Sequence, residues 1–415
     1  MTAFIAAALV LIAAYFVQMR IFRDHVFDDL SFTEKLDETE VAVGDDIYLY
    51  EEITNDKGLP IPYLKATSTL PDGLAFRLTE FTDKDTPDGK ERTVRDRLTS
   101  TVDSMFVVKG HQKITRRWRI ACMKRGVYTL GGALVVSNDL IGFCPVSRQI
   151  DPPTGKGASV TVLPAPVDLE REFTSSRYFS GDVVVEKSLL SDPLLRAGVR
   201  DYTPGDPVRR INWKSTAAHD RLLVNIEEKV RKLQANIIVN MCSHMIEPDP
   251  EVPGTPEFIE YNITVAATLI GRFASENVPV RLIANTPPET IHPDFTAGED
   301  EDGKKILVTP PFSGKYGVLD AMRVLAELRM LYSMPTERLF DYILEEPELF
   351  AENGNIVVVT AVFDARMLVF HDEMTRRGID VIFYLTTTGR VYADIPPEVR
   401  IFYRTWSDSF KAGEV

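Results

Sequence analysis

The sequence predicts a multidomain α+β protein: an N-terminal transmembrane helix, an antiparallel β-sandwich-like domain and a doubly wound α/β domain. Three observations predict it. Residues 1–19 carry no charged side chain. Residues 31–165 contain short runs of β-forming residues broken by turns and glycines. From residue 233 onward, short apolar runs alternate with segments of helical periodicity, which is typical of βαβ units.

The first 23 residues are predicted to form a membrane anchor. At 1.5 Å per residue, the uncharged run would span about 28 Å as a helix, close to the ~30 Å apolar core of a bilayer. Arg20 and Arg23 follow the run and favour the cytoplasm for the chain after it. We therefore expect a single pass through the cell membrane, with the bulk of the chain cytoplasmic. A helix buried in a soluble core is the alternative.

Residues 31–165 are predicted to form the β-sandwich-like domain. Turn signals occur at residues 55–58, where Asn-Asp-Lys-Gly stands, and at residues 71–73, where Pro-Asp-Gly stands. Short strands separated by glycines follow, which favours an antiparallel sandwich. The charged stretch over residues 82–97 is expected to be an exposed hairpin tip or loop.

Residues 233–415 are predicted to form the doubly wound α/β domain. Strands are expected over residues 233–242, 278–285, 355–363 and 381–386, and helices over 257–277, 316–331, 337–346 and 367–378. Residues 286–305 are rich in proline and then in acidic side chains, so they are expected to be a solvated excursion from the domain.

Bulk composition excludes several function classes. A net charge of −14 argues against general nucleic-acid binding, which needs a basic surface. The three cysteines, Cys122, Cys144 and Cys242, are widely spaced and odd in number, so neither a disulfide framework nor a zinc site is expected. We expect them to be small buried core residues.

Residues 166–232 are predicted to be a linker with a distinctive basic segment. Residues 186–232 contain ten Lys/Arg against seven Asp/Glu in an otherwise acidic chain. Asp206 is expected to cap a short helix that has Pro207 at its first position and presents Trp213 on one face. Two interpretations stay open: a structural connector, in which Trp213 fills a core and the arginines pair with Asp201 and Asp206, or a docking surface for an acidic partner.

This segment also resembles a known family. Its sequence RDYTPGDPVRRINWKSTA is similar to the pattern R-x-Y-x-x-G-D-x-x-R-x-I-x-W of the domain-of-unknown-function family 58. The resemblance extends to LPDGL at residues 70–74 and to KRGVYTLGG and NDLIGF within residues 124–143, so it covers nearly the whole chain. Members of family 58 often have two membrane helices before the sandwich-like domain, whereas this sequence predicts only one.

The resemblance implies a fold, a partner and a site. It implies a von Willebrand factor A-like C-terminal domain and a MoxR-type AAA+ ATPase as partner. The partner-binding residues that it and the local charge pattern indicate are Arg200, Asp201, Tyr202, Pro204, Gly205, Asp206, Arg209, Arg210, Asn212, Trp213 and Lys214.

Von Willebrand factor A-like domains typically hold a divalent cation in a D-x-S-x-S loop after the first strand. The equivalent place here has Asn240, Cys242 and His244. A hard cation prefers oxygen ligands, and the loss of a carboxylate lowers its affinity. Asp364 stands where a later acidic ligand is expected, yet alone it makes a weak site. We predict no metal or cofactor, with Mg²⁺ left as an open alternative.

No catalytic residues are predicted. The six histidines are scattered, and the chain has no G-x-S-x-G, P-loop or G-x-G-x-x-G motif. The predicted function is a membrane-anchored, non-enzymatic adaptor or scaffold that works with a MoxR-type AAA+ ATPase on envelope or metal-dependent client proteins. The alternatives are an envelope-associated hydrolase with an unmarked active site and an extracellular adhesion module.

Overall fold

The structure is a computed structural model, and it describes residues 2–403 with gaps. Left undescribed are residues 87–88, 140–141, 153–156, 168, 170–190, 205–210, 220, 230–233, 244–255, 287–295, 300–304, 347–353, 388–390, 392 and 404–415. The chain divides into two compact units, residues 1–166 with 322–328, and residues 167–321 with 329–415. The sequence-based division at residues 1–23, 31–165, 166–232 and 233–415 stays a prediction.

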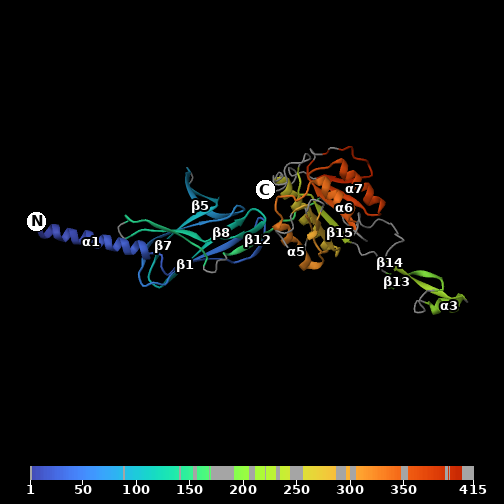
Figure 1. The fold of residues 1–415 in the computed structure, drawn as a ribbon, viewed down its shortest axis with the longest axis horizontal. Coiled ribbons are helices and arrows are strands. Elements are labelled where there is room, and N and C mark those ends of the chain that lie inside the picture. The colour runs from blue at the N-terminus through green and yellow to red at the C-terminus, as the bar shows by residue number, and fades with distance from the viewer. Residues whose placement is uncertain are drawn as a thin grey trace. The chain divides into compact units, whose positions relative to one another are not determined.

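Strands dominate the first unit (Figure 1). One sheet has the order β1-β3-β8-β5-β6, a second β11-β10-β4-β7, and a small third β2-β12-β9. The bounds are β1 Leu30–Leu36, β2 Glu40–Ala42, β3 Asp46–Asn55, β4 Ile61–Thr69, β5 Leu74–Thr86, β6 Gly89–Thr99, β7 Thr101–Val108, β8 Gln112–Cys122, β9 Gly126–Thr129, β10 Ala133–Ser137, β11 Val146–Ile150 and β12 Ser159–Leu163.

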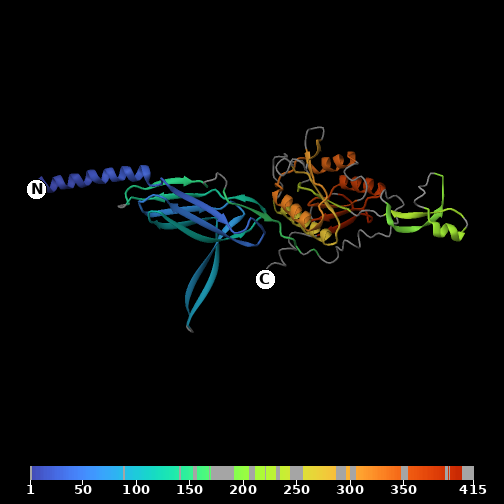
Figure 2. The same cartoon turned by 90° about the horizontal axis from the view of Figure 1, so that it is seen from below.

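Alternating side chains build the core of this unit. Along β7, exposed and buried residues alternate at every position, as expected of a strand with one face in a core and one in water. Two buried clusters result, one around Phe32, Ile53 and Phe106 and the other around Leu49 and Phe76. The predicted charged hairpin is present, because β5 and β6 pair antiparallel, and Figure 2 shows them extending away from the neighbouring strands.

The N-terminal helix α1 (Thr2–His25) ends against the sandwich. Phe22, Val26 and Phe27, at its end and in the turn after it, pack on the Phe32 cluster. Lys57 donates to the backbone carbonyls of His25 and Val26. The last turn of the helix is therefore held by both apolar packing and a cation.

The predicted membrane anchor is wrong. In the part of the chain that the structure describes, no helix is both long and apolar enough to cross a membrane. Helix α1 runs past the uncharged stretch and includes Arg20, Arg23 and Asp24. The side chains of residues 1–8 lie outside the described part of the chain. The predicted single-pass location depended on this span and is withdrawn with it.

The second unit contains a seven-stranded sheet with the order β17-β18-β16-β15-β19-β20-β21. Strand β15 pairs in parallel with β16 and β19, and the parallel series continues through β20 to β21. Strands β17 and β18 extend the other edge antiparallel. The bounds are β15 Gln234–Val239, β16 Val280–Ala284, β17 Thr296–Glu299, β18 Lys305–Val308, β19 Gly354–Thr360, β20 Val381–Leu385 and β21 Arg400–Tyr403.

Helices cover this sheet. Helices α6 and α7 bury Phe340, Phe370 and Met374 in one cluster with strand residues such as Ile238 and Phe383. Helix α4 contacts β15, β16 and β19. The helix bounds are α4 Pro256–Ser275, α5 Gly314–Glu327, α6 Thr336–Glu345 and α7 Ala365–Arg376.

The predicted fold class, a transmembrane helix followed by a sandwich-like domain and a doubly wound A-like domain, is therefore wrong. No membrane-spanning helix is found among the described residues, and strands account for more of those residues than helices do. The sheet of the second unit is mixed, because β18 pairs antiparallel with β16 and β17 pairs antiparallel with β18. Strand β17 forms from residues that were expected to be a solvated excursion, and β18 begins at the last residue of that stretch.

Candidate functional site

The segment that carries the family-like pattern forms a small ribbon with a helix. Strand β13 (Ser191–Asp201) pairs antiparallel with β14 (Leu223–Lys229), and helix α3 (Trp213–His219) lies between them in the chain. The backbone N–H of Tyr202 donates to Leu222 O at 2.9 Å. Buried Ile211 makes a bridge to Val224. Both ends of the loop that holds α3 are thus fixed to the ribbon.

The helix of this segment begins later than predicted. Asn212 provides the cap, because its Oδ1 accepts from the backbone N–H of Ser215 at 3.0 Å. The Thr216 hydroxyl then accepts from the backbone N–H of Leu223 at 3.0 Å, which ties the helix to β14. Asp206 and Pro207, where the cap was expected, lie outside the described residues together with Gly205, Arg209 and Arg210.

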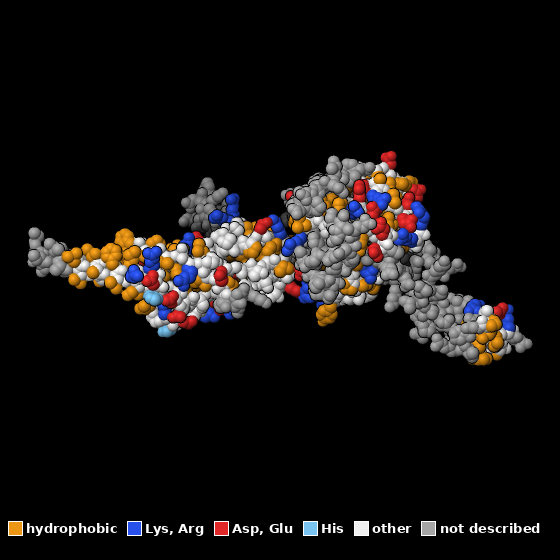
Figure 3. Space-filling view, in the orientation of Figure 1, with side chains coloured by type: hydrophobic (Ala, Val, Ile, Leu, Met, Phe, Trp, Pro, Cys, Tyr) orange, Lys and Arg blue, Asp and Glu red, His pale blue; other side chains and the backbone are white. Residues whose placement is uncertain are grey.

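Trp213 is exposed, so the expectation that it fills a core is wrong. Its relative exposure is 64%, and helix α3 has no buried residue. Val199 and Leu222 on the ribbon are exposed as well. In Figure 3, the described surface over α3 shows hydrophobic and basic side chains side by side. The segment therefore presents an aromatic side chain to its surroundings instead of burying it.

The charged residues of the segment are partly paired. Arg221 forms an ion pair with Asp201 at 3.3 Å, and Arg200 donates to the Asp201 carbonyl at 3.0 Å. Lys214 is exposed and has no ion-pair partner in the described parts of the chain. The structure thus brings Arg200, Asp201, Tyr202, Asn212, Trp213 and Lys214 into one small substructure, and Pro204 is exposed in the loop that follows β13.

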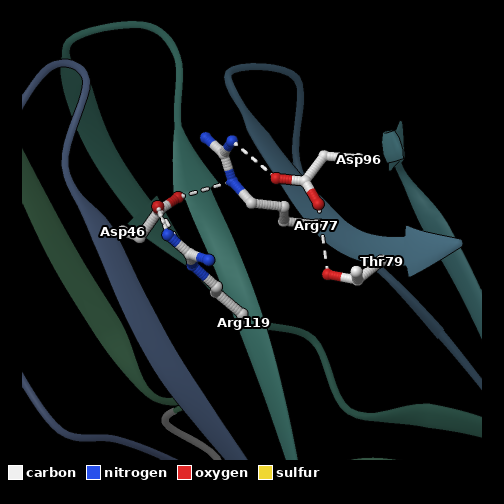
Figure 4. A network of polar contacts seen from close by, with 5 residues as sticks. All are labelled: Asp46, Arg77, Thr79, Asp96 and Arg119. Atoms are coloured by element: carbon white, nitrogen blue, oxygen red, sulfur yellow. Dashed lines mark hydrogen bonds and ion pairs between the residues drawn. The ribbon is translucent and has the colours of Figure 1, made fainter. Parts of the chain in front are cut away.

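A second charged surface lies on the sandwich and is neutralised. Asp46 on β3 accepts from Arg77 Nε at 3.0 Å and from Arg119 Nε at 3.1 Å (Figure 4). Arg77 also pairs with Asp96 at 3.4 Å, and Thr79 donates to the same carboxylate. These two arginines therefore have carboxylate partners within the sheet and offer less to an outside partner than an unpaired lysine does.

The predicted metal loop forms a neutral hydrogen-bond network. Asn240 directly follows β15 and is fully buried. Its side-chain N–H₂ donates to the hydroxyls of Thr336 and Thr360, each at 3.0 Å. Its Oδ1 accepts from the backbone N–H of Cys242 at 3.1 Å and from Asn285 Nδ2 at 3.2 Å. The amide thus has partners on both its donor and its acceptor side.

The network extends along the carboxyl ends of the parallel strands, where open α/β sheets commonly bind ligands. Asn285 Oδ1 accepts from the backbone N–H of Met241 at 2.7 Å. Asn262 on α4 donates to the Asn240 carbonyl at 2.9 Å, and the Thr386 hydroxyl donates to Asn262 Oδ1 at 2.7 Å. Neutral amides and hydroxyls therefore fasten α4 and α6 to the strand ends.

The residues at this place do not fit a hard divalent cation. Asp364 is the nearby acidic candidate, and its Oδ1 accepts from the backbone N–H of Met367 at 3.0 Å as the cap of α7. Burial raises the pKa of Asp364, which disfavours the charged form that a cation needs. Over the described ranges, no three His, Cys, Asp or Glu side chains gather in one place. His244 lies outside those ranges, and the absence of a cofactor stays a prediction.

Sequence analysis missed two buried carboxyl groups in the sandwich. Glu34 and Glu51 occupy inward positions in strands whose other inward residues are mostly apolar, such as Phe32 and Ile53. A carboxylate that interrupts an alternating apolar pattern was the available signal. This signal was missed because Lys35 and Glu52, the charged residues next to Glu34 and Glu51, made the carboxylates look like part of an exposed charged stretch.

Comparison with known proteins does not assign the chain to a family. No family model matches the chain, and no curated protein matches it. Similar solved structures include a type I cohesin of Pseudobacteroides cellulosolvens, with 12% identity, a TM-score of 0.20, and coverage of 34% of this chain and 97% of that one. A non-cellulosomal cohesin of Archaeoglobus fulgidus has 12% identity, a TM-score of 0.19 and coverage of 36% and 99%.

A CARDB domain of Pyrococcus furiosus has 15% identity, a TM-score of 0.18, and coverage of 33% of this chain and 88% of that one. TM-scores this low identify neither a shared fold nor a shared function. The A-like, doubly wound assignment of residues 233–415 is withdrawn because the sheet there is mixed, with β17 and β18 antiparallel at one edge.

Proposed function

We propose that the chain is a non-enzymatic adaptor whose docking element is the substructure formed by β13, α3 and β14. The observation that carries the proposal is the exposure of Trp213 on a helix that is capped and tied to the ribbon. An aromatic side chain held in place on the surface loses little conformational freedom on binding, and tryptophan is enriched among the residues that dominate interfaces. A tryptophan with only a structural role would be buried.

The chemistry of this docking element favours an acidic partner. Lys214 follows Trp213 directly, and Arg200 lies on β13 of the same substructure. The surrounding sequence carries an excess of positive charge in an otherwise acidic chain. A partner surface with an apolar pocket for the indole and a rim of carboxylates would complement it.

The identity of the partner rests on sequence resemblance alone. Arg200, Tyr202, Ile211 and Trp213 match the family 58 pattern within the described residues, and that family implies a MoxR-type AAA+ ATPase. We therefore propose such an ATPase as the partner, with envelope or metal-dependent proteins as clients. The membrane anchor is no longer part of the proposal.

Co-purification of the full-length chain from its native host tests the proposal. The native chain is compared with a Trp213→Ala/Lys214→Glu variant, and co-purified proteins are identified by mass spectrometry. Tyr316→Ala is the matched control, because Tyr316 is also an exposed aromatic residue, at 84% exposure, on a different helix. We expect an AAA+ ATPase with the native chain and the control, and its loss from the double variant.

Two results would contradict the proposal. Retention of the ATPase by the folded double variant would place the docking surface elsewhere. Absence of any ATPase from all three samples would remove the implied partner. The alternatives of a hydrolase and of a metal-dependent adhesion module have no observation in their favour, and the neutral Asn240 network argues against the second.

A further inference from the structure

Two buried carboxyl groups lie opposite each other inside the sandwich. In the register of β1 with β3, Glu34 pairs with Glu51, and in the register of β3 with β8, Glu51 pairs with Arg116. Directly opposed residues of antiparallel strands share a face, with Cβ atoms about 4.5–5.5 Å apart. Glu51 is fully buried and Glu34 is 8% exposed. Two ionised carboxylates on opposed, buried positions repel each other, at an electrostatic cost that burial increases.

The carboxyl groups of Glu51 and Glu34 differ in the hydrogen-bond donors that surround them. Glu51 Oε1 accepts from the Ser68 hydroxyl at 2.6 Å. Its Oε2 accepts from the Ser104 hydroxyl at 3.0 Å and from Trp118 Nε1 at 2.8 Å. Three hydrogen-bond donors are thus directed at one carboxyl group. Glu34 accepts from the backbone N–H of Gly132 at 3.1 Å, and the pair's proton is therefore best placed on Glu34.

The cationic side chains near Glu34 and Glu51 contact other groups. The Arg116 guanidinium lies over the Phe106 ring, 4.5 Å from its centroid, and donates to the Met105 carbonyl at 3.1 Å. On the opposite face of the sheet, Lys35 and Lys113 both pair with Glu52. On β11, Arg148 lies over the Phe27 ring at 5.5 Å. Among the described residues, no cation is therefore recorded within ion-pair distance of Glu34 or Glu51.

We propose that Glu34 and Glu51 form a proton-linked latch on strand β1. Among the described strands, β1 is the edge of its sheet and is hydrogen-bonded to β3 alone, so repulsion across this pair acts on the contact that holds it. With one proton on the pair, β1 stays docked. When Glu34 releases its proton to solvent, two buried carboxylates face each other and β1 loosens from β3.

The direction of the pH effect follows from the protonation of Glu34. Burial is the main cause that raises the pKa of Glu34 to about 7; the Gly132 N–H opposes this shift, and the charge of Glu51 adds a smaller increase. The docked strand thus binds a proton that a released strand does not. The stabilisation is complete below the ordinary glutamate pKa and is lost as pH rises through about 7.

Hydrogen exchange of the full-length chain tests the latch. Exchange of peptides that cover residues 30–36 is followed by mass spectrometry from pH 5.5 to 8.5, with correction for the intrinsic exchange rate. We expect protection of β1 to fall about 30-fold over this range, since each pH unit between 5.5 and the pKa of about 7 contributes about tenfold and the loss levels off above that pKa. Peptides that cover β19 serve as an internal reference and are expected to keep their protection.

Two variants isolate the pair. Glu34→Gln mimics the protonated side chain, so its β1 protection is expected to stay high at pH 8.5. Glu52→Gln is the matched control: Glu52 is the next residue in β3, faces solvent and pairs with lysines, and this variant is expected to follow the native chain. All other ionisable side chains are present in the native chain and in Glu34→Gln, so their effects cancel in that comparison.

Identical pH dependence in the native chain and in Glu34→Gln would overturn the latch, as would constant β1 protection in the native chain.

Infrared spectroscopy of the native chain gives a readout that needs no variant. The carbonyl band of a protonated carboxyl group is expected at pH 5.5 and not at pH 8.5. Its absence at pH 5.5, or its persistence at pH 8.5, would also refute the proposal.

Discussion

The side-chain amide of Asn240 donates to the Thr360 hydroxyl at 3.0 Å, and this bond joins the ends of the parallel strands β15 and β19. The same amide accepts from the backbone N–H of Cys242. A side chain with both donors and acceptors is therefore required here. A carboxylate, which a cation-binding loop would use, has the acceptors only.

Asn240→Asp tests this requirement. The change removes both N–H donors and places a carboxylate in a fully buried, neutral network, so we expect the free energy of unfolding to fall by about 2–4 kcal/mol. Denaturant unfolding of the native chain and the variant, each with EDTA and with excess Mg²⁺, measures it. We expect Mg²⁺ to leave both midpoints unchanged. Selective recovery of the variant in Mg²⁺ would show that the strand ends can complete a cation site.

The exposure of Trp213 gives a second prediction. Removal of a buried tryptophan typically costs about 3–5 kcal/mol. Because this indole is mostly exposed, we expect Trp213→Ala to change stability by less than about 0.5 kcal/mol, as is usual for surface substitutions. Thermal unfolding followed by circular dichroism measures it. A loss in the range of a buried tryptophan would restore the structural connector interpretation.

Local patterns predicted many individual elements. The apolar run at residues 233–242 gives β15, and the helical periodicity over residues 257–277 gives α4. Strands β17 and β18 were missed because their residues flank an acidic stretch, and they form by pairing, β18 with β16 and β17 with β18. Periodicity describes how a segment buries its own side chains, and it does not describe which distant strand will pair with it.

Less of the candidate site than of the fold could be predicted from the sequence. The pattern located Trp213 but not its exposure, because burial depends on what the rest of the chain packs against it. The Asn240 network includes residues as far as 44 positions apart, as Asn285 and Met241 are, and 124 positions apart, as Thr386 and Asn262 are. Amide and hydroxyl residues at such separations carry no local signal, so only the substituted loop residues were identified.

The cap of helix α3 gives a third prediction. Asn212→Ala removes the acceptor for the Ser215 N–H, and lost caps of this kind cost about 1 kcal/mol. We expect faster hydrogen exchange in residues 213–219 and weaker partner binding, since Trp213 would no longer be held in place. Asn212→Ser keeps a capping oxygen and is expected to behave like the native chain. Equal exchange in the alanine and serine variants would show that the helix does not depend on this cap.

The end of helix α1 gives the last prediction. Lys57 donates to the last carbonyls of the helix, where a cation also interacts favourably with the helix dipole. Lys57→Met keeps much of the aliphatic stem and removes the charge, so we expect a loss of about 1 kcal/mol and faster exchange in residues 20–27. Lys65→Met is the matched control, because Lys65 pairs with Asp103 on the surface and such pairs contribute little. If both variants lose the same stability and neither alters exchange at the helix end, apolar packing of Phe22 and Phe27 alone would be sufficient to hold α1 on the sandwich.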